Sequence, residues 1–302
     1  MECRQPGRQA SDLRSEARLR NQRLIPGGTD GGQQTPRLWH DGSGRRWFVM
    51  SAAPGDHGAR RRPDLADQTV VVIGASAGIG LETARQVRAC GGQVVLVGRN
   101  PERLQQVALE LHPLGTAAFD ATDTDRLKQF FQDLPGPVDH VMVTAGGPFY
   151  LPLESMDLAD ARRAFDERLA MTLAVALYSR DKVRAGGTLL FIGGTGGRRP
   201  GVGMTVMSAV TAALPALTAN LALELAPIRV NLIAAGFVDT PLSASLLGDQ
   251  LDARREELRA TLPIRRVVVP ADVAALAVHI MCNDALTGGT YDVDGGQQLL
   301  SH

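Results

Sequence analysis

The stretch "TVVVIGASAGIG", Thr69–Gly80, decides the fold of this chain. A run of β-branched residues predicts a buried strand, and a turn containing Gly74, Gly78 and Gly80 leads into a helical stretch that ends at Ala89. Such a turn lets the free N–H groups of the helix start face a pyrophosphate. A glycine-rich turn without a ligand is the alternative, but a second strand about 20 residues further on gives the context that nucleotide binding requires.

Strands and helices alternate along the rest of the chain. Apolar runs predict strands at Thr69–Gly74, Gln93–Gly98, Thr116–Asp120, Asp139–Gly146, Thr188–Gly194, Ile228–Gly236 and Thr290–Gly296. Helical patterns lie between them at Ile79–Ala89, Pro101–His112, Asp123–Leu134, Leu158–Arg184, Ser208–Ala226 and Ala271–Asn283. The sequence therefore predicts an α/β fold, a doubly wound Rossmann-type parallel sheet of about seven strands with helices on both faces. It forms one domain over residues 65–302.

Residues 1–64 differ from the rest of the chain in charge and pattern. They contain 12 Arg against 2 Glu and 5 Asp, which gives this segment a charge of about +5. Because the segment is rich in Gly, Gln and Pro and has no sustained period, we expect a disordered basic extension. One alternative is upstream sequence translated from a mis-called start, with Met50 as the true start. Another is a basic tail that contacts nucleic acid or an organelle import receptor.

The overall composition narrows the class of protein. The formal net charge of the 302 residues is zero, which gives no general attraction to nucleic acid or membranes. Cys3, Cys90 and Cys282 lack metal-binding or disulfide spacing, so we expect no metal site and a cytoplasmic location. No apolar run approaches the roughly 20 residues that a membrane-spanning helix needs. The expected partner is a small-molecule substrate.

The end of the second strand, "VGRN", bears on cofactor choice. An acidic residue at Gly98 would bond the ribose hydroxyls of NAD(H), and none is present. The next residue is Arg99, which can pair with the 2′-phosphate of NADP(H). The sequence therefore favours NADP(H) over NAD(H), with a solvated arginine at a strand end as the alternative.

From about Gln68 to Leu300 the chain resembles the short-chain dehydrogenase/reductase family. The motif Gly74-x-x-x-Gly78-x-Gly80 matches the family's cofactor glycines, and "IRVNLIAAGFVDTPL", Ile228–Leu242, matches the strand and loop that cradle nicotinamide. Val143 and Thr144 depart from the family's asparagines, and Ala235 from its proline. The resemblance implies the strand order 3-2-1-4-5-6-7. With Arg99, the cofactor positions are Gly74, Ser76, Ala77, Gly78, Ile79, Gly80, Asp120, Ala121, Ala145, Gly146, Thr211, Gly236, Val238 and Thr240.

The same resemblance locates four catalytic positions, and this chain has substitutions at all of them. The family uses Asn, Ser, Tyr and Lys, with the Tyr phenol passing a proton and the Lys ammonium lowering the phenol pKa. Here these positions fall on Arg168, Gly194, Met207 and Thr211. A thioether cannot donate a proton, and a threonine hydroxyl carries no charge. No catalytic residue is therefore assigned from the family pattern.

Three residues are candidate replacements, each with an ordinary structural alternative. Tyr150, in the loop after the fourth strand, could act as an acid or simply form a pocket wall. Arg168 could bring charge into the site or form a surface salt bridge. Thr195 could orient a substrate oxygen or be an ordinary loop residue.

Two hypotheses about function follow from these residues. The first is an NADP(H)-binding oxidoreductase with a substituted catalytic tetrad, which transfers hydride to or from a small carbonyl or alcohol-type substrate. The alternative is a catalytically inactive NADP(H)-binding sensor or partner subunit. The resemblance also implies a homo-oligomer, a dimer or tetramer formed by paired long helices.

The segment "YSRDK", Tyr178–Lys182, has the spacing of a catalytic Tyr-x-x-x-Lys pair. It precedes the fifth strand, whereas the catalytic pair of the family follows that strand. We therefore predict a solvated helix terminus far from the cofactor, with Lys182 in the last turn interacting with the helix dipole.

Overall fold

The computed structural model describes residues 37–40, 46–49 and 63–300 of the chain. Two compact units are present, Met1–Arg60 and Arg61–His302. In the first, strands β1 (Arg37–His40) and β2 (Arg46–Val49) form an antiparallel pair. The predicted extension, residues 1–64, lies mostly outside the described residues, and this pair of strands was not predicted.

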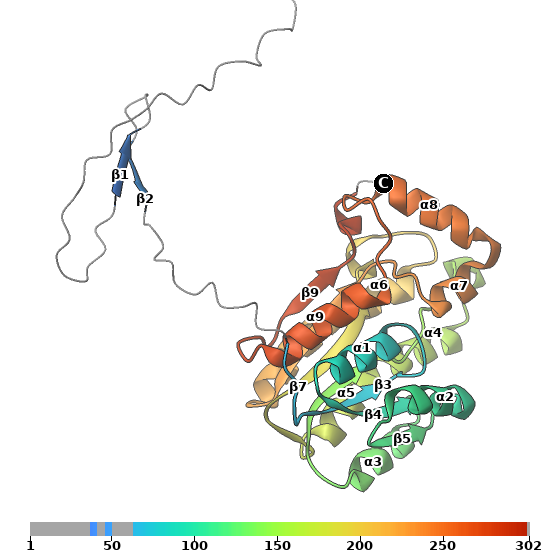
Figure 1. Cartoon of the computed structure of the whole chain (residues 1–302). Coiled ribbons are helices and arrows are strands. Elements are labelled where there is room, and N and C mark those ends of the chain that lie inside the picture. Colours follow the sequence, from blue (N-terminus) through green and yellow to red (C-terminus); the bar gives the residue numbers. More distant parts are fainter. Residues whose placement is uncertain (1–36, 41–45, 50–62, 301–302) are drawn as a thin grey trace, which may run out of the picture. The chain divides into compact units, whose positions relative to one another are not determined.

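The second unit is built on a seven-stranded parallel sheet (Figure 1). The strands are β3 (Thr69–Ile73), β4 (Gln93–Gly98), β5 (Gly115–Ala118), β6 (Val138–Val143), β7 (Val183–Gly194), β8 (Arg229–Ala235) and β9 (Thr290–Val293). Their order in the sheet is β5-β4-β3-β6-β7-β8-β9. This confirms the predicted order 3-2-1-4-5-6-7, because β3 is the first strand of the sheet. It also places the start of the glycine turn in the middle of the sheet.

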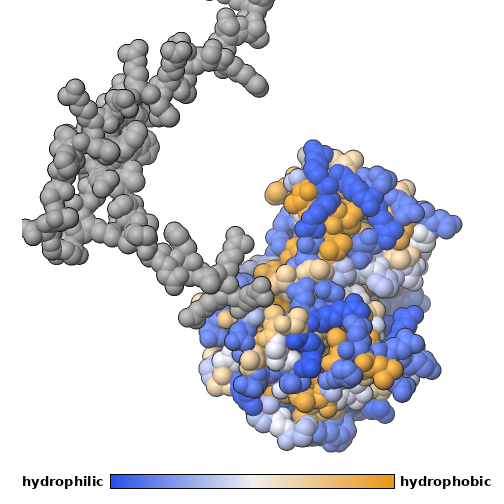
Figure 2. All heavy atoms as spheres, in the orientation of Figure 1, coloured by the Kyte–Doolittle hydropathy of each residue, from blue (hydrophilic) through white to orange (hydrophobic). Residues whose placement is uncertain are grey.

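Helices cover both faces of the sheet. The helices are α1 (Gly78–Ala89), α2 (Pro101–Leu111), α3 (Thr124–Asp133), α4 (Leu158–Phe165), α5 (Met171–Ser179), α6 (Thr205–Glu224), α7 (Pro241–Leu247), α8 (Leu251–Thr261) and α9 (Pro270–Cys282). Val71 and Ile73 of β3 pack in the core with residues of α3, α5 and α6. Val70 and Val72 point to the opposite face and pack with residues of α1, α2 and α9. On the side drawn in Figure 2, hydrophilic residues separate smaller hydrophobic areas.

Two features of the fold differ from the predicted elements. The helix expected at Leu158–Arg184 consists of α4, a π-helical turn η2 (Asp166–Ala170) and α5, and the strand β7 already begins at Val183. Helices α7 and α8 were not predicted. Arg255 of α8 holds them to the preceding loop through two hydrogen bonds to the carboxylate of Asp239, at 2.8 and 2.9 Å.

Helix α6 is long and apolar enough to cross a membrane by length and composition. The expectation that no apolar run reaches this length was therefore wrong. In the fold, α6 packs against the sheet with buried residues along its length, among them Val210, Leu214 and Leu221. A core helix of a globular domain passes the same test of length and composition, and α6 has that place here.

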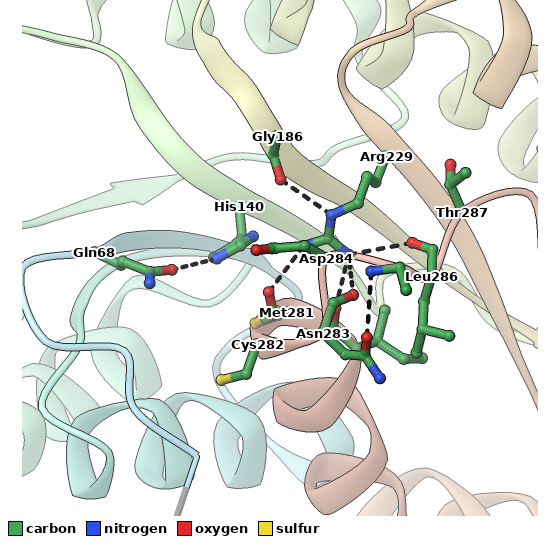
Figure 3. A network of polar contacts seen from close by, with 12 residues as sticks. Gln68, His140, Gly186, Arg229, Met281, Cys282, Asn283, Asp284, Leu286 and Thr287 are labelled. Carbon is green, nitrogen blue, oxygen red and sulfur yellow. Dashed lines mark hydrogen bonds and ion pairs between the residues drawn. The ribbon is translucent and has the colours of Figure 1, made fainter. Parts of the chain in front are cut away.

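A buried arginine fastens the end of α9 to the sheet (Figure 3). Arg229, the first residue of β8, is 6% exposed. Its guanidinium donates five hydrogen bonds of 2.8–3.2 Å to backbone carbonyls, those of Gly186, Ile280, Met281, Asn283 and Leu286. Most of these carbonyls lie in or just after the last turn of α9, where helix geometry leaves them without partners.

His140 lies near this arginine in a buried environment (Figure 3). The residue is 3% exposed, its Nε2–H donates to Gln68 Oε1 at 2.7 Å, and Nδ1 has no hydrogen-bond partner in the described part of the chain. Burial, with a smaller contribution from the charge of Arg229, lowers the pKa of His140 to about 4. The fold therefore favours the neutral ring, because a proton on Nδ1 would place an unpaired charge in the interior.

We expect this histidine to make stability depend on pH. The unfolded chain binds a proton near pH 6.5 and the folded chain only near pH 4, so stability present above pH 6.5 is lost as the pH falls toward 4. Between pH 7 and pH 5 the free energy of unfolding should fall by about 2 kcal/mol from this group. Urea unfolding of the wild type and of His140→Asn at both pH values measures the effect. An equal loss in the variant would contradict the assignment to His140.

Lys182 has a different role from the one predicted. Helix α5 ends at Ser179, so Lys182 lies beyond its last turn. Its Nζ donates to the carbonyls of Gln132 and Leu134, at 3.1 and 3.0 Å, and these lie at the end of α3. Lys182 therefore stabilises the C-terminus of α3 rather than that of its own helix.

Candidate active site

A cleft of about 560 Å³ lies at the carboxyl edge of the sheet. The loops after β3, β4, β5, β6 and β8 form it, and a parallel sheet binds ligands at this edge. Its lining includes Gly74, Ser76, Ala77, Gly78, Ile79, Arg99, Asp120, Ala121, Ala145, Gly146 and Thr240, all of which were predicted to hold the cofactor. The structure therefore brings most of the predicted cofactor positions together.

A second, larger hollow, of about 710 Å³, lies beside the edge strand β5 and helix α3. Its lining is mainly apolar, with Phe119 and Phe130 on one side. Its lining contains no residue of the glycine turn and none from the start of α1. For this reason we place the nucleotide in the smaller cleft.

Two glycines in the turn between β3 and α1 allow neighbouring parts of the chain to approach closely. A Cβ on Gly74, whose φ is +97°, would lie 2.4 Å from Thr144 Oγ1. A Cβ on Gly80 would lie 2.3 Å from the carbonyl oxygen of Gly74. Thr144 Oγ1 in turn donates to the Gly74 carbonyl at 3.1 Å. Thr144, which the sequence analysis treated only as a departure from the family, therefore fastens the end of β6 to the glycine turn.

The first turn of α1 presents uncapped N–H groups to this cleft. Its N-cap residue, Ala77, has an extended backbone and no side-chain hydrogen bond to the helix. A Cβ on Gly78, whose φ is +58°, would be in ordinary van der Waals contact with Thr240 Cγ2, at 3.5 Å, so no atom crowds this position. A pyrophosphate fits these features, because the uncapped N–H groups and the helix dipole both favour an anion there.

Polar residues surround the far end of the cleft, at the end of β4. The Arg99 side chain is 80% exposed and lies 3.8 Å from Asp120. Asp120 Oδ1 accepts hydrogen bonds from the backbone N–H and hydroxyl of Thr122, which orient the carboxylate. Arg103 of α2 also lines the cleft, and the sequence analysis did not select it. Arg103 lies four residues after Arg99, and this spacing in the sequence was the signal that could have identified it.

The predicted nicotinamide loop follows β8. Thr240 lines the cleft and caps α7, its Oγ1 accepting from the N–H of Ser243. Gly236 and Val238 are not in the lining of the cleft. A Cβ on Gly236 would lie 2.6 Å from Asp294 Cβ, so this glycine permits close packing on the turn after β9. Val238 pairs with Val268 and supports the same loop.

The family's catalytic positions come together next to this loop. A Cβ on Gly194 would lie 3.4 Å from Thr211 Cγ2, so β7 and α6 place the two positions side by side. Met207 is 7% exposed. The Thr211 hydroxyl donates to the carbonyl of Met207 at 2.7 Å, one turn earlier in α6. Thr211 does not line the cleft, and its hydroxyl is used within the helix, so neither residue offers a proton to a ligand.

Arg168 lies in the π-helical turn η2, and its guanidinium binds the carboxyl ends of β6 and β7. Nη1 donates to the carbonyls of Ala145 and Ile192, both at 3.3 Å, and Nη2 donates to that of Gly147 at 3.5 Å. Burial lowers the pKa of Arg168, and the nearby Tyr150 phenol partly offsets this shift. The guanidinium still carries its charge at neutral pH, since an arginine is not deprotonated in proteins. The guanidinium therefore binds backbone carbonyls beside the cleft, and its role toward a ligand stays a prediction.

The other two candidate replacements lie on either side of this region. Tyr150 is 56% exposed, in the loop after β6. Burial of the phenol against its neighbours raises the pKa of Tyr150, and the charge of Arg168 partly opposes that shift. Thr195, directly after β7, is 5% exposed. Of these two, only Tyr150 combines an ionisable group with access to solvent.

Comparisons with known proteins agree with this arrangement. Residues 74–298 match the family model described as enoyl-(acyl carrier protein) reductase. The chain is 30% identical to "Dehydrogenase/reductase SDR family member 4" of Sus scrofa over 253 residues, covering 79% of this chain and 90% of that protein. It is 32% identical to an uncharacterized oxidoreductase of Mycobacterium tuberculosis over 250 residues, covering 77% and 92%. A solved small-chain dehydrogenase in complex with NADPH matches with a TM-score of 0.67 and 28% identity, covering 77% of this chain and 99% of that one.

Proposed function

The chain belongs to the short-chain dehydrogenase/reductase family, and on that premise we propose that it is an NADP(H)-dependent oxidoreductase acting on a small carbonyl or alcohol-type substrate. The cleft carries this proposal. It combines the glycine turn, the uncapped start of α1 and the arginine-lined end of β4. The glycine turn and the start of α1 suit the pyrophosphate, and the end of β4 suits the adenosine side.

When bound, the reduced cofactor would supply hydride, and the chain's own residues would bind and orient it. The N–H groups at the start of α1 would hold the pyrophosphate. Arg99, supported by Arg103, would pair with the 2′-phosphate of NADP(H), whereas NAD(H) offers no such partner. Thr240 and the loop after β8 would hold the nicotinamide side. We therefore propose NADP(H) as the preferred cofactor.

A second function is favoured by one specific observation. Met207 and Thr211 offer no proton at the usual catalytic position, since the Thr211 hydroxyl is bound to the helix backbone. A chain of this kind could bind NADP(H) without turnover, as a sensor or as a partner subunit. Cofactor binding is common to both functions, and turnover separates them.

Turnover is tested by following NADPH absorbance with panels of ketones, aldehydes, enones and imines. The proposed enzyme should oxidise NADPH in the presence of at least one substrate class. Proton transfer contributes about 10²–10⁴-fold to such reactions, so even a site with a weak donor should keep measurable activity. Tight NADPH binding with no turnover on any panel would support the sensor or partner-subunit function instead.

We also propose that the chain forms a homo-oligomer through α5. Leu173 and Leu177 are one turn apart on this helix and are 48% and 60% exposed. An interface would remove this apolar surface from water. Size-exclusion chromatography with light scattering gives the mass, and a monomer at micromolar concentration would contradict the proposal.

A further inference from the structure

We infer that Tyr150 passes the proton to the substrate oxygen and that Arg168 is the positioning residue that supports it. This inference rests on the proposed function, because only a carbonyl that receives hydride needs this proton. It assigns the proton-transfer role to the loop after β6 instead of to helix α6, where the family's tyrosine position lies.

The loop that carries Tyr150 is fastened on both sides to the start of α6. Phe149 packs against Val206 and Val210, the residues that flank the position of Met207 in the helix. On the other side of Tyr150, the N–H of Leu151 donates to the Gly203 carbonyl at 3.0 Å. Tyr150 is therefore held next to the first turn of α6, where the family places its catalytic tyrosine. The family position and Tyr150 belong to different elements, helix α6 and the loop after β6, and the hydrogen bond of Leu151 joins that loop to Gly203, just before α6.

Arg168 fixes a positive charge beside this loop. Its three hydrogen bonds to Ala145, Gly147 and Ile192 use three of the five N–H groups of the guanidinium and prevent it from swinging out to solvent. Gly146 leaves room for this guanidinium, since a Cβ at that position would lie 3.1 Å from Arg168 Cζ. Two N–H groups remain for a phenolate or a substrate oxygen.

The electrostatics of the pair suit an acid at neutral pH. Tyr150 is only partly exposed, and this partial burial raises the pKa of its phenol, so the phenol keeps its proton until a stronger base forms next to it. An alkoxide is such a base. The charge of Arg168 favours the phenolate that remains. Because the side chain is 56% exposed, water can restore the lost proton.

The step is balanced as follows. The substrate carbon accepts hydride from the reduced cofactor, and the electron pair of the carbonyl π bond moves to the substrate oxygen. The O–H bond of Tyr150 breaks, its electron pair stays on the phenolate oxygen, and its proton goes to the substrate oxygen. A water molecule then returns a proton to the phenolate.

The matched pair of variants is Tyr150→Phe and Tyr178→Phe. Each removes one hydroxyl from one of the chain's three tyrosines, and Tyr178 lies on α5 in the segment that only imitates the catalytic motif. Tyr150→Phe should lower kcat by about 10²–10⁴-fold and remove the alkaline limb of its pH profile, with NADPH affinity unchanged. Tyr178→Phe should leave kcat unchanged. If Tyr150→Phe has the same kcat as the wild type, this inference is overturned, but the proposed function stands.

A spectroscopic titration tests the pair without turnover. Phenolate absorbance, measured with pH in the wild type and in Tyr150→Phe, gives the pKa of Tyr150 by difference. Arg168→Gln should shift this titration to higher pH, because the supporting charge is lost. An unchanged titration in Arg168→Gln overturns the role of Arg168. Absence of wild-type turnover, with the pKa shift present, counts against the proposed function and against the catalytic role of Tyr150 alike.

Discussion

Replacement of Arg229 by methionine should lower the free energy of unfolding by about 3–5 kcal/mol. The guanidinium is buried at the first position of β8 and satisfies five backbone carbonyls (Figure 3). A methionine side chain has similar length but no N–H group, so the buried carbonyls of Ile280 and Met281 would lose the donor that the structure gives them. The carbonyls of Asn283 and Leu286 keep a second donor, from Leu286 N–H and Asn231 Nδ2. Asp284, the nearest acid at 3.8 Å, is 93% exposed, so the loss comes from the carbonyl bonds rather than from an ion pair.

Urea unfolding monitored by circular dichroism measures this effect. The matched control is Arg180→Met, because Arg180 is 57% exposed and, among the described residues, its ion pair is with the exposed Asp181. It should change the free energy of unfolding by less than about 0.5 kcal/mol. Equal effects of the two substitutions would show that Arg229 does not fasten the end of α9.

Replacement of Gly74 by valine should weaken NADPH binding by about 10- to 100-fold. The residue has φ of +97°, which a β-branched side chain rarely adopts, and its Cβ would contact Thr144 Oγ1 at 2.4 Å. The turn would have to move away from the end of β6, and this displaces the start of α1 from the pyrophosphate position. The free energy of unfolding should also fall, since the same clash strains the protein when no cofactor is bound.

Calorimetric titration of NADPH, together with a thermal unfolding curve, separates the two effects. Gly115→Val is the matched control, because no atom lies within 4 Å of a Cβ at that position in β5. This control should bind NADPH as the wild type does. A folded Gly74→Val protein with wild-type affinity would exclude the glycine turn as the pyrophosphate site.

The arrangement of the sheet was predictable because its strands are short apolar runs bounded by turns. Gln93–Gly98 was predicted with its exact limits. The long helix was predicted with wrong limits because Leu158–Arg184 contains no glycine or proline to mark its interruption. Arg168, in the π-helical turn, contacts the loop after β6 and strand β7, and a local pattern does not contain such contacts. Helices α7 and α8 were missed for a similar reason, because the Arg255–Asp239 pair that holds them joins residues 16 positions apart in the sequence.

The cofactor side of the site was more predictable than the catalytic side. Its residues are concentrated in turns with glycine spacing, and the physical reason for each glycine is local. Thr144 and Arg103 were missed because their roles appear only when β6 and α2 are placed around the turn. The relation between Tyr150 and Arg168 depends on the loop after β6 meeting η2, which no sequence spacing reveals.

The central claim is that the cleft binds NADP(H) through Arg99. Calorimetric titration of NADPH and NADH into the wild-type protein and into Arg99→Leu tests it most directly. We predict that the wild type binds NADPH at least about 10-fold more tightly than NADH, and that Arg99→Leu loses this preference while its NADH affinity is unchanged. Equal affinity of the wild type for both nucleotides, or no binding of either one, would contradict the account.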